Sequence, residues 1–332
     1  MAGLPEPIAR QKHSPAGTPN GCAALYGGLQ LRRRFRSSPG RRVRRQLALV
    51  LLLPGLALVP AAPAAEPARH RVATLLPFAA DALARIDGPF TVVASVRRDL
   101  HVAVRGAADL GTAHAPSLEQ LAEVRPTLVI ADESLHAVQA PRLGIDGAAV
   151  MLLDTRSVAA TLAGLDAVGA RIGAADAMRR ETDAVRSQLA ALVRPEPLPT
   201  LALFGAPGSF LVLTGRTWLG DLLARLGYRN LGDAVGGDER FPGLLALSDE
   251  RLSTLRPELL LLVAHGDPAA IAAGFTDRTA RGGPWQGLRR SATRGVHVLD
   301  PELFAANPGL RLGQAAEALR ALAHPVASGA AR

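Results

Sequence analysis

The feature that most constrains this 332-residue chain is an internal repeat. Residues 117–131 read SLEQLAEVRPTLVIA, and residues 248–262 read SDERLSTLRPELLLL. Each copy begins with a serine suited to capping a helix, continues as a short helical segment, breaks at Arg-Pro and ends in an apolar strand. The same unit in both halves predicts two similar lobes with a cleft between them. Each lobe presents one matching glutamate, Glu119 or Glu250.

Local electrostatics offers a second explanation for these glutamates. Ser117 with Gln120 three residues later has the pattern of a capping box, and Glu250 lies in the first turn after its own serine. An acidic side chain is stabilising near the positive end of a helix dipole. Pro126 ends the first helix and favours an extended conformation at the arginine before it.

The net charge of +9 lies in the first 65 residues. That segment holds ten of the 38 basic residues and one of the 29 acidic residues, so 28 of each remain in the rest of the chain. A balanced remainder does not supply the basic face that nucleic acids require. We therefore expect no nucleic-acid partner.

Residues 41–65 have the parts of a secretory signal peptide: basic residues at 41–45, an apolar run at 47–59, and Ala62-Pro63-Ala64 before a cleavage point. The run is shorter than the roughly 20 residues that a membrane span needs. Residues 1–40 are expected to be a disordered extension. Cys22 is the only cysteine and precedes the run, which excludes a lipoprotein anchor and leaves no disulfide. The sequence predicts a periplasmic protein released by signal cleavage, without a lipid anchor.

After residue 70, short apolar strands alternate with helices. The expected strands are Arg71–Leu76, Thr91–Val96, Leu128–Ala131, Ala149–Leu153, Leu201–Phe204, Leu259–Ala264 and Val296–Leu299. This alternation predicts an α/β fold of two Rossmann-like lobes with parallel sheets covered by helices.

One long helix is predicted between the two halves. Met178, Val185, Leu189 and Leu192 recur there at helical spacing. A single backbone helix joining the lobes predicts limited hinge motion. The expected organisation is an N-terminal lobe at 70–172, the linking helix at 173–195, a C-terminal lobe at 199–325 and a tail at 326–332.

The order and spacing of several further motifs resemble a known family. These motifs are RVATLLP from Arg71, DLGT from Asp109, TGRTWLGDLL from Thr214, LGYRNL from Leu226, DPELF from Asp300 and NPGLR from Asn307. Together they are similar to the helical-backbone (class III) periplasmic substrate-binding proteins of ABC importers, which carry ferric siderophores, haem or cobalamin. The resemblance covers Arg71 to Pro325.

The resemblance implies a function and partners. It implies a solute-binding protein, not an enzyme, that delivers an iron chelate (siderophore), haem or a cobalamin-type ligand to an ABC importer. Its partners would be a membrane-embedded permease dimer with its ATPase. Glu119 and Glu250 match the glutamates that dock into arginine pockets on the permease in such proteins. We expect a monomer with no cofactor of its own.

Candidate ligand contacts follow from the position of the strands. Ligands of open α/β sheets bind beyond the carboxyl ends of the strands. That rule, with the segments that precede each repeat, selects Pro77, Phe78, Arg97, Arg98, His101, His114, Arg240, Phe241, His265 and Phe304. Arg97 and Arg98 suit an anionic ligand, or else form a solvated network with their neighbours. Phe241 and Phe304 either stack on a ligand or belong to the core.

The histidines leave one alternative open, a receptor for a bare divalent metal. His101, His114, His136 and His265 all fall in loops at the expected cleft, but no two have a ligand spacing. We expect no resident metal. Tyr228, the only tyrosine after the leader, follows a helix end, which argues against tyrosine-ligated haem and leaves ligation by His101 or His265 open.

An enzyme on the same doubly wound scaffold is the rival from another class. The dinucleotide and P-loop patterns are both absent, and the glycine-rich segment at 205–209 fits neither. A structural or adhesive protein is a third option and predicts no deep cleft between lobes.

Overall fold

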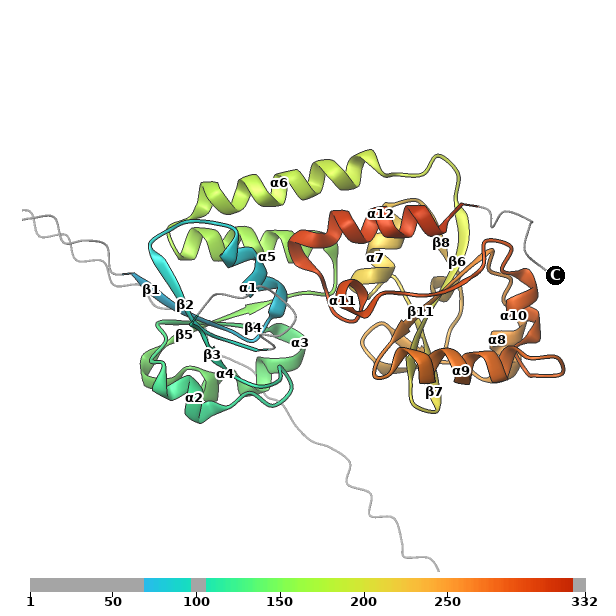
Figure 1. The fold of residues 1–332 in the computed structure, drawn as a ribbon, viewed down its shortest axis with the longest axis horizontal. Coiled ribbons are helices and arrows are strands. Elements are labelled where there is room, and N and C mark those ends of the chain that lie inside the picture. Colours follow the sequence, from blue (N-terminus) through green and yellow to red (C-terminus); the bar gives the residue numbers. More distant parts are fainter. Residues whose placement is uncertain (1–68, 97–105, 325–332) are drawn as a thin grey trace, which may run out of the picture. The chain divides into compact units, whose positions relative to one another are not determined.

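In the computed structural model of the chain, residues 69–96 and 106–324 are described. Two β-sheets, one in each lobe, organise them (Figure 1). The first sheet has the order β3-β2-β1-β4-β5, with every neighbouring pair parallel. Its strands are β1 (His70–Thr74), β2 (Phe90–Ser95), β3 (Ala108–Asp109), β4 (Leu128–Asp132) and β5 (Ala149–Leu153). The strand order reverses between β1 and β4, which is the switch point where doubly wound sheets bind ligands.

Helices and short helical turns connect these strands. They are α1 (Pro77–Ala84), α2 (Leu118–Glu123), α3 (Glu133–His136), η1 (Ala137–Gln139), α4 (Ala140–Leu143), η2 (Ile145–Gly147) and α5 (Val158–Arg171). All five residues of β4 are buried, as a parallel strand covered on both faces requires.

The second sheet is mixed, so the expectation of parallel sheets is wrong for this lobe. Its order is β12-β11-β6-β7-β10-β9, with β8 paired to β6. β7 runs antiparallel to β6, and β10 runs antiparallel to both β7 and β9. The strands are β6 (Leu198–Ala206), β7 (Ser209–Leu213), β8 (Tyr228–Asn230), β9 (Asp238–Phe241), β10 (Leu244–Ala246), β11 (Leu259–Ala264) and β12 (Val296–Val298).

A two-residue turn causes this reversal. Pro207 and Gly208 join β6 to β7, and Gly208 has a φ of +78°, a conformation that glycine adopts without strain. The glycine-rich segment is therefore a hairpin turn. The helical elements of this lobe are α7 (Trp218–Arg225), η3 (Leu231–Ala234), α8 (Asp249–Thr254), α9 (Pro268–Thr279), α10 (Gln286–Ser291), α11 (Pro301–Phe304), η4 (Gly309–Arg311) and α12 (Leu312–Leu322).

The predicted linking helix is present as α6 (Ala175–Ala191). Met178, Val185 and Leu189 are buried on one of its faces. A side chain on Gly313 of α12 would collide with Gln188 of α6, so these two helices approach closely. The helix α6 packs on α5 of the first lobe and on α12 and η4 of the second, so it braces the two lobes (Figure 1).

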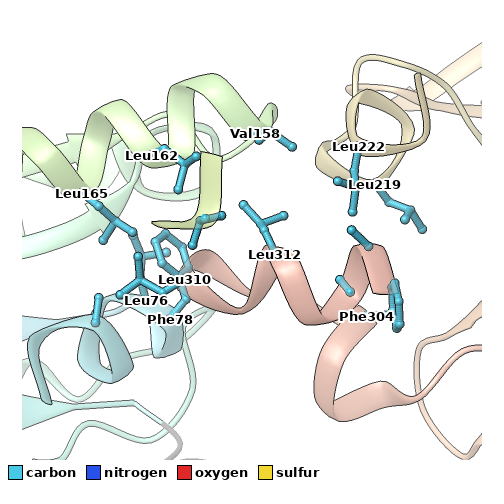
Figure 2. Close-up of a cluster of buried hydrophobic side chains, with 14 of the residues drawn as sticks. Leu76, Phe78, Val158, Leu162, Leu165, Leu219, Leu222, Phe304, Leu310 and Leu312 are labelled. Atoms are coloured by element: carbon cyan, nitrogen blue, oxygen red, sulfur yellow. The ribbon is translucent and has the colours of Figure 1, made fainter. Parts of the chain in front are cut away.

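One hydrophobic cluster extends through both lobes. Phe78 and Leu165 from the first lobe surround Leu310, while Phe304 lies beside Leu219 of α7 (Figure 2). Leu312 lies between these two groups and has no exposed surface. A shared core of this kind opposes large separation of the lobes.

Both copies of the repeat fold as the same unit, α2 before β4 and α8 before β11. The hydroxyl of Ser117 accepts a hydrogen bond from the Gln120 amide at 3.2 Å, and that of Ser248 accepts one from the Arg251 amide at 3.4 Å. Only the serine half of the predicted capping box forms, because the Gln120 side chain donates instead to Glu123.

The end of α2 differs from the prediction. Arg125 has a φ of +42° and is left-handed, so the expectation of an extended residue before Pro126 is wrong. Arg125 directly follows the C-cap of α2, where a left-handed residue commonly ends a helix. Arg71 in β1 stabilises this end, because its guanidinium donates to the carbonyl of Val124 at 2.6 Å and to that of Arg125 at 3.1 Å. These bonds satisfy carbonyl groups that a helix end leaves free.

Within residues 69–96 and 106–324, no helix combines the length and the apolar character that crossing a bilayer demands.

Candidate functional site

A cavity of about 200 Å³ lies between the lobes, where the loop after β5 faces two loops of the second lobe. Its walls are formed by Asp154, Arg156, Ser157, Gly215, Arg216 and Pro242. Each lobe therefore contributes three residues, and one of the three is an arginine. This cavity is the candidate functional site.

The wall from the first lobe is held by a bidentate ion pair. Arg156 donates from Nε and Nη2 to the two carboxylate oxygens of Asp154, at 2.9 and 3.0 Å. The Asp154 carboxylate also accepts the Arg156 amide at 2.9 Å. The side-chain hydrogen bond from Arg156 holds the pKa of Asp154 below its usual value, so the pair is charged at neutral pH. Ser157 follows and caps α5 by accepting from the Ala160 amide.

The wall from the second lobe is built on the TGRT segment that follows β7. Arg216 donates from Nη1 to Glu239 at 2.7 Å, and the other carboxylate oxygen of Glu239 accepts the Gly243 amide at 2.6 Å. That backbone bond, and then the charge of Arg216, lower the pKa of Glu239. Thr217 caps α7 through the Gly220 amide. Both carboxylates of the site thus remain anionic and orient their arginines.

The chemistry offered by these walls is recognition of anions. The side chains of Arg156 and Arg216 are 48% and 66% exposed, so both can reach a ligand. A guanidinium presents five N–H donors in a fixed plane, and the ion pairs above use only some of them. A ligand with several carboxylate or catecholate-type oxygens could bond to both lobes at once.

Phe241 is an exposed apolar side chain next in sequence to the cavity wall. It ends β9, precedes the cavity residue Pro242 and is 63% exposed. Arg240, its neighbour, pairs with Asp238 at 3.2 Å.

The other predicted ligand contacts are distributed differently. Phe78 and Phe304 are only 4% and 2% exposed and belong to the core cluster, so we leave them out of the proposed site. Pro77 is half-buried at the start of α1, and His114 is exposed before α2. Arg97, Arg98 and His101 lie outside the described residues.

The remaining histidines have different environments. His265 is exposed at the carboxyl end of β11, and its ring stacks on Phe204 with the centroids 5.3 Å apart. His136 is fully buried: its Nδ1 accepts the Asp132 amide at 3.1 Å, and its Nε2 lies 2.7 Å from the Ala113 carbonyl oxygen. The structure thus gives His136 a packing role. Among the residues that the structure describes, no three His, Cys, Asp or Glu side chains are grouped to hold a metal ion.

Tyr228 is buried in the second lobe and donates its hydroxyl to the carbonyl of Leu319 at 2.9 Å. Burial raises the pKa of this phenol. A tyrosine so placed is a structural residue.

Sequence reasoning missed the two arginines of the cavity. The carboxyl-end rule would have found Arg156 if it had been applied to the strand at 149–153, which was predicted with its correct bounds. Arg216 follows an antiparallel strand, to which the rule does not apply. In the sequence, only the TGRT motif, which is part of the family resemblance, pointed to Arg216.

A larger cavity, about 440 Å³, lies between the β6–β7 turn and α9. All of its lining residues belong to the second lobe. The guanidinium of Arg278, one of its two charged lining residues with Asp277, lies 4.8 Å from the centre of the Trp285 ring and 3.6 Å from Asp249. A ligand in this cavity would not bridge the lobes, so we prefer the smaller cavity as the candidate site.

The predicted docking glutamates are both exposed, in the first turns of α2 and α8. Hydrogen bonding by the Ser248 side chain lowers the pKa of Glu250, which keeps that carboxylate charged. In Figure 1, α2 and α8 lie on the side of the view opposite α6.

Comparison with known proteins adds three findings. Residues 83–281 match the family described as Periplasmic binding protein. The Fe(3+) dicitrate-binding periplasmic protein FecB of Escherichia coli (strain K12) is 27% identical over 205 residues, which cover 60% of this chain and 65% of FecB. The high-affinity heme uptake system protein IsdE of Staphylococcus aureus (strain Newman) is 28% identical over 102 residues, 31% of this chain and 32% of IsdE. The match thus spans less than two thirds of either relative.

Solved structures share the fold. An ABC transporter substrate-binding protein from Listeria monocytogenes EGD-e aligns with a TM-score of 0.65 and 22% identity, covering 76% of this chain and 98% of the other. At this identity the similarity supports the architecture of two lobes and a backbone helix.

Proposed function

The chain belongs to the periplasmic binding protein family, and from that membership we propose that it is the extracytoplasmic solute-binding protein of an ABC importer, with a ferric chelate as its ligand. The observation that carries this proposal is the cavity between the lobes with one arginine from each side, Arg156 and Arg216. A polyanionic ligand that bonds to both arginines would join the lobes. The mechanism is capture and release, without a chemical step.

The size of the cavity favours a compact chelate. Its volume, about 200 Å³, is below the range of roughly 300–1,000 Å³ typical of pockets for drug-sized ligands. A ferric polycarboxylate is small and carries the oxygens that guanidinium groups recognise. FecB, whose name specifies ferric dicitrate, is the relative matched over the longer segment.

Haem is the second candidate. It is favoured by the exposed His265, whose imidazole stands at the carboxyl end of β11, and by the flat apolar surface of Phe241. IsdE is named as a haem uptake protein. Axial ligation by His265 would shift and sharpen the Soret band of added haemin, and His265→Ala should abolish that shift.

We further propose that Glu119 and Glu250 dock the loaded protein on a permease dimer that works with an ATPase. Two exposed carboxylates on equivalent helices match a two-fold symmetric partner that offers arginine pockets. The proposed route to the periplasm is the signal peptide at 41–65, and the proposed mature chain is a monomer without a lipid anchor. We also propose that the first lobe spans residues 70–172 and the second lobe residues 199–325.

Ligand binding to the secreted protein tests the function. The protein would be titrated with ferric citrate, citrate alone, a ferric catecholate, haemin and cyanocobalamin. Tryptophan fluorescence would report binding, because Trp218 follows the TGRT segment. We expect saturable binding of ferric citrate. Losing a hydrogen bond to a charged group costs about 1.5–3 kcal/mol, so Arg156→Ala and Arg216→Ala should each weaken binding roughly 10- to 100-fold.

The matched control is Arg180→Ala, an exposed arginine on α6. It should bind like the unchanged protein. The proposal fails if no ligand of the panel binds saturably, and the assigned site fails if both cavity variants bind as the control does.

A further inference from the structure

The loop that carries Arg156 is held by side chains from the other lobe. Asn307, which precedes η4, donates from Nδ2 to the carbonyl oxygen of Thr155 at 2.8 Å and to the hydroxyl of Thr161 at 2.7 Å. Asp221, in α7, accepts the backbone amide of Val158 at 2.8 Å. Both attachments cross between the lobes, and two of the three bonded groups, in Thr155 and Val158, lie within two residues of Arg156.

Asn307 is itself fixed in one orientation. Its side-chain oxygen accepts the Gly309 amide at 2.9 Å, which leaves the nitrogen to face Thr155 and Thr161. The turn that follows cannot relax easily, because Gly309 has a φ of +57° and a side chain there would collide with Phe78 of the core. The amide therefore projects from a rigid support.

Asp221 is oriented in a similar way. The same carboxylate oxygen accepts a hydrogen bond from Nε of Arg225, one turn later in α7, at 2.7 Å. The Val158 amide that it accepts is one of the donors left free at the start of α5. A carboxylate at this position is also favoured by the dipole of α5. The second lobe thus completes the cap that Ser157 begins.

The first lobe holds the same loop from its other side. The hydroxyl of Thr155 donates to Asp132 at the end of β4. Asp132 also accepts the amide of Leu135 at 2.9 Å, as the cap of α3. Thr155 is consequently fixed between the end of a buried strand and Asn307.

From these contacts we infer that Asn307 and Asp221 are positioning residues, which hold the Asp154–Ser157 loop so that Arg156 faces a ligand shared with Arg216. Neither side chain lines the cavity. Each of the two side chains makes the position of Arg156 depend on how closely the lobes pack. Loss of either hydrogen bond between the lobes should therefore weaken the affinity for an anionic ligand. The inference rests on the proposed function, because it assumes that Arg156 contacts the ligand.

A double-mutant cycle tests the inference. Affinity for ferric citrate would be measured for the unchanged protein, Asn307→Ala, Arg156→Ala and the double variant. Coupled contacts interact by about 0.5–3 kcal/mol, so we expect Asn307→Ala to weaken binding about tenfold when Arg156 is present and less than about twofold when it is absent. A residue that only stabilises the fold would weaken binding equally in both backgrounds, and that result, or no loss in either, overturns the inference.

Asp221 gives a second test through a conservative variant. Asp221→Asn keeps an oxygen that can accept the Val158 amide, whereas Asp221→Ala does not. We expect Asp221→Asn to bind ferric citrate nearly as well as the unchanged protein and Asp221→Ala to bind it several-fold more weakly. Equal affinities of the two variants would count against the inference.

Amide hydrogen exchange separates this inference from the proposed function. Asn307→Ala should speed exchange in residues 155–161 and leave α9 unchanged, whether or not a ligand binds. If the unchanged protein binds no compound of the panel, the proposed function fails, and faster exchange confined to 155–161 would still support the positioning contact. Exchange that is unchanged at 155–161 overturns the inference independently of ligand.

Discussion

At the scale of single residues, the site consists of arginines that carboxylates already hold in place. Arg156 is bonded to Asp154 and Arg216 to Glu239, so their guanidinium planes are ordered before a ligand arrives. Order of this kind lowers the entropy that binding must remove. The same carboxylates reduce the attraction for an anion. A multidentate ligand can overcome that reduction, whereas a single carboxylate gains little.

The Asp154–Arg156 ion pair should make the stability of the protein depend on pH. The pKa of Asp154 is lower in the folded protein than in the unfolded chain, so the stabilisation is present above the unfolded pKa and is lost as the pH falls through the folded value. Because the Asp154 side chain is 35% exposed, Asp154→Asn should lower the free energy of unfolding by less than about 1 kcal/mol at pH 7. Urea unfolding at pH 7 and pH 3 measures this difference.

The loss of unfolding free energy caused by Asp154→Asn should be smaller at pH 3 than at pH 7. Asp87→Asn, at an exposed position in the loop after α1, is the control and should change stability little at either pH. A difference for Asp154→Asn that grows as the pH falls would contradict the prediction.

At the same scale, a local rule can select a residue of a loop or strand end but cannot tell whether a distant segment covers it. Phe241 was selected by its position before the repeat and is exposed. Phe78 was selected by the end of a strand, but Gly309, more than 200 residues later, allows η4 to pack against its ring. The left-handed Arg125 and the residue before it are held by hydrogen bonds from Arg71, which lies 54 residues before Arg125. Contacts at such separations leave no trace in a local pattern.

At the scale of helices and strands, prediction succeeded where an uninterrupted apolar run defines an element. β5 and β11 have the bounds expected from their uninterrupted apolar residues. β9 and β10 were not predicted, because all four residues of β9 are exposed and β10 has only three residues. Pairing makes them strands, β10 with β7 and β9 with β10, and pairing is a property of the whole sheet.

The two repeated helices predict equal effects of equal substitutions. Ser117→Ala and Ser248→Ala each remove a side chain that accepts an amide of the first turn, so each should lower the free energy of unfolding by about 1 kcal/mol. Chemical denaturation of the two variants measures the losses. Ser187→Ala, at an exposed position in the middle of α6, is the control and should not destabilise. If both cap variants matched this control, the serines would not stabilise their helices.

At the scale of the whole molecule, docking and binding should be separable. Glu119→Arg with Glu250→Arg reverses both charges on helices that do not line the cavity. We expect ferric citrate affinity to stay within about twofold while uptake into cells falls on the order of tenfold or more, since like charges would meet at the permease. Transport of labelled ferric citrate, beside the binding titration, gives both values.

The control for docking is Asp176→Arg, a charge reversal at the start of α6. It should leave uptake intact. Uptake by the double glutamate variant equal to that of the control would remove the docking role and leave only helix-start electrostatics for Glu119 and Glu250.

Because the two lobes share one hydrophobic core, a single break in the chain between them should not separate them. A break between Arg194 and Leu198, after α6, would leave Phe78 and Leu165 on one fragment and Leu310 and Leu312 on the other. Neither fragment could shield its apolar face from water by itself. The two pieces should therefore remain associated after a single nick and should be insoluble when produced apart. The two halves share one repeated unit in sequence, yet each covers apolar surface that the other would expose to water if it were alone.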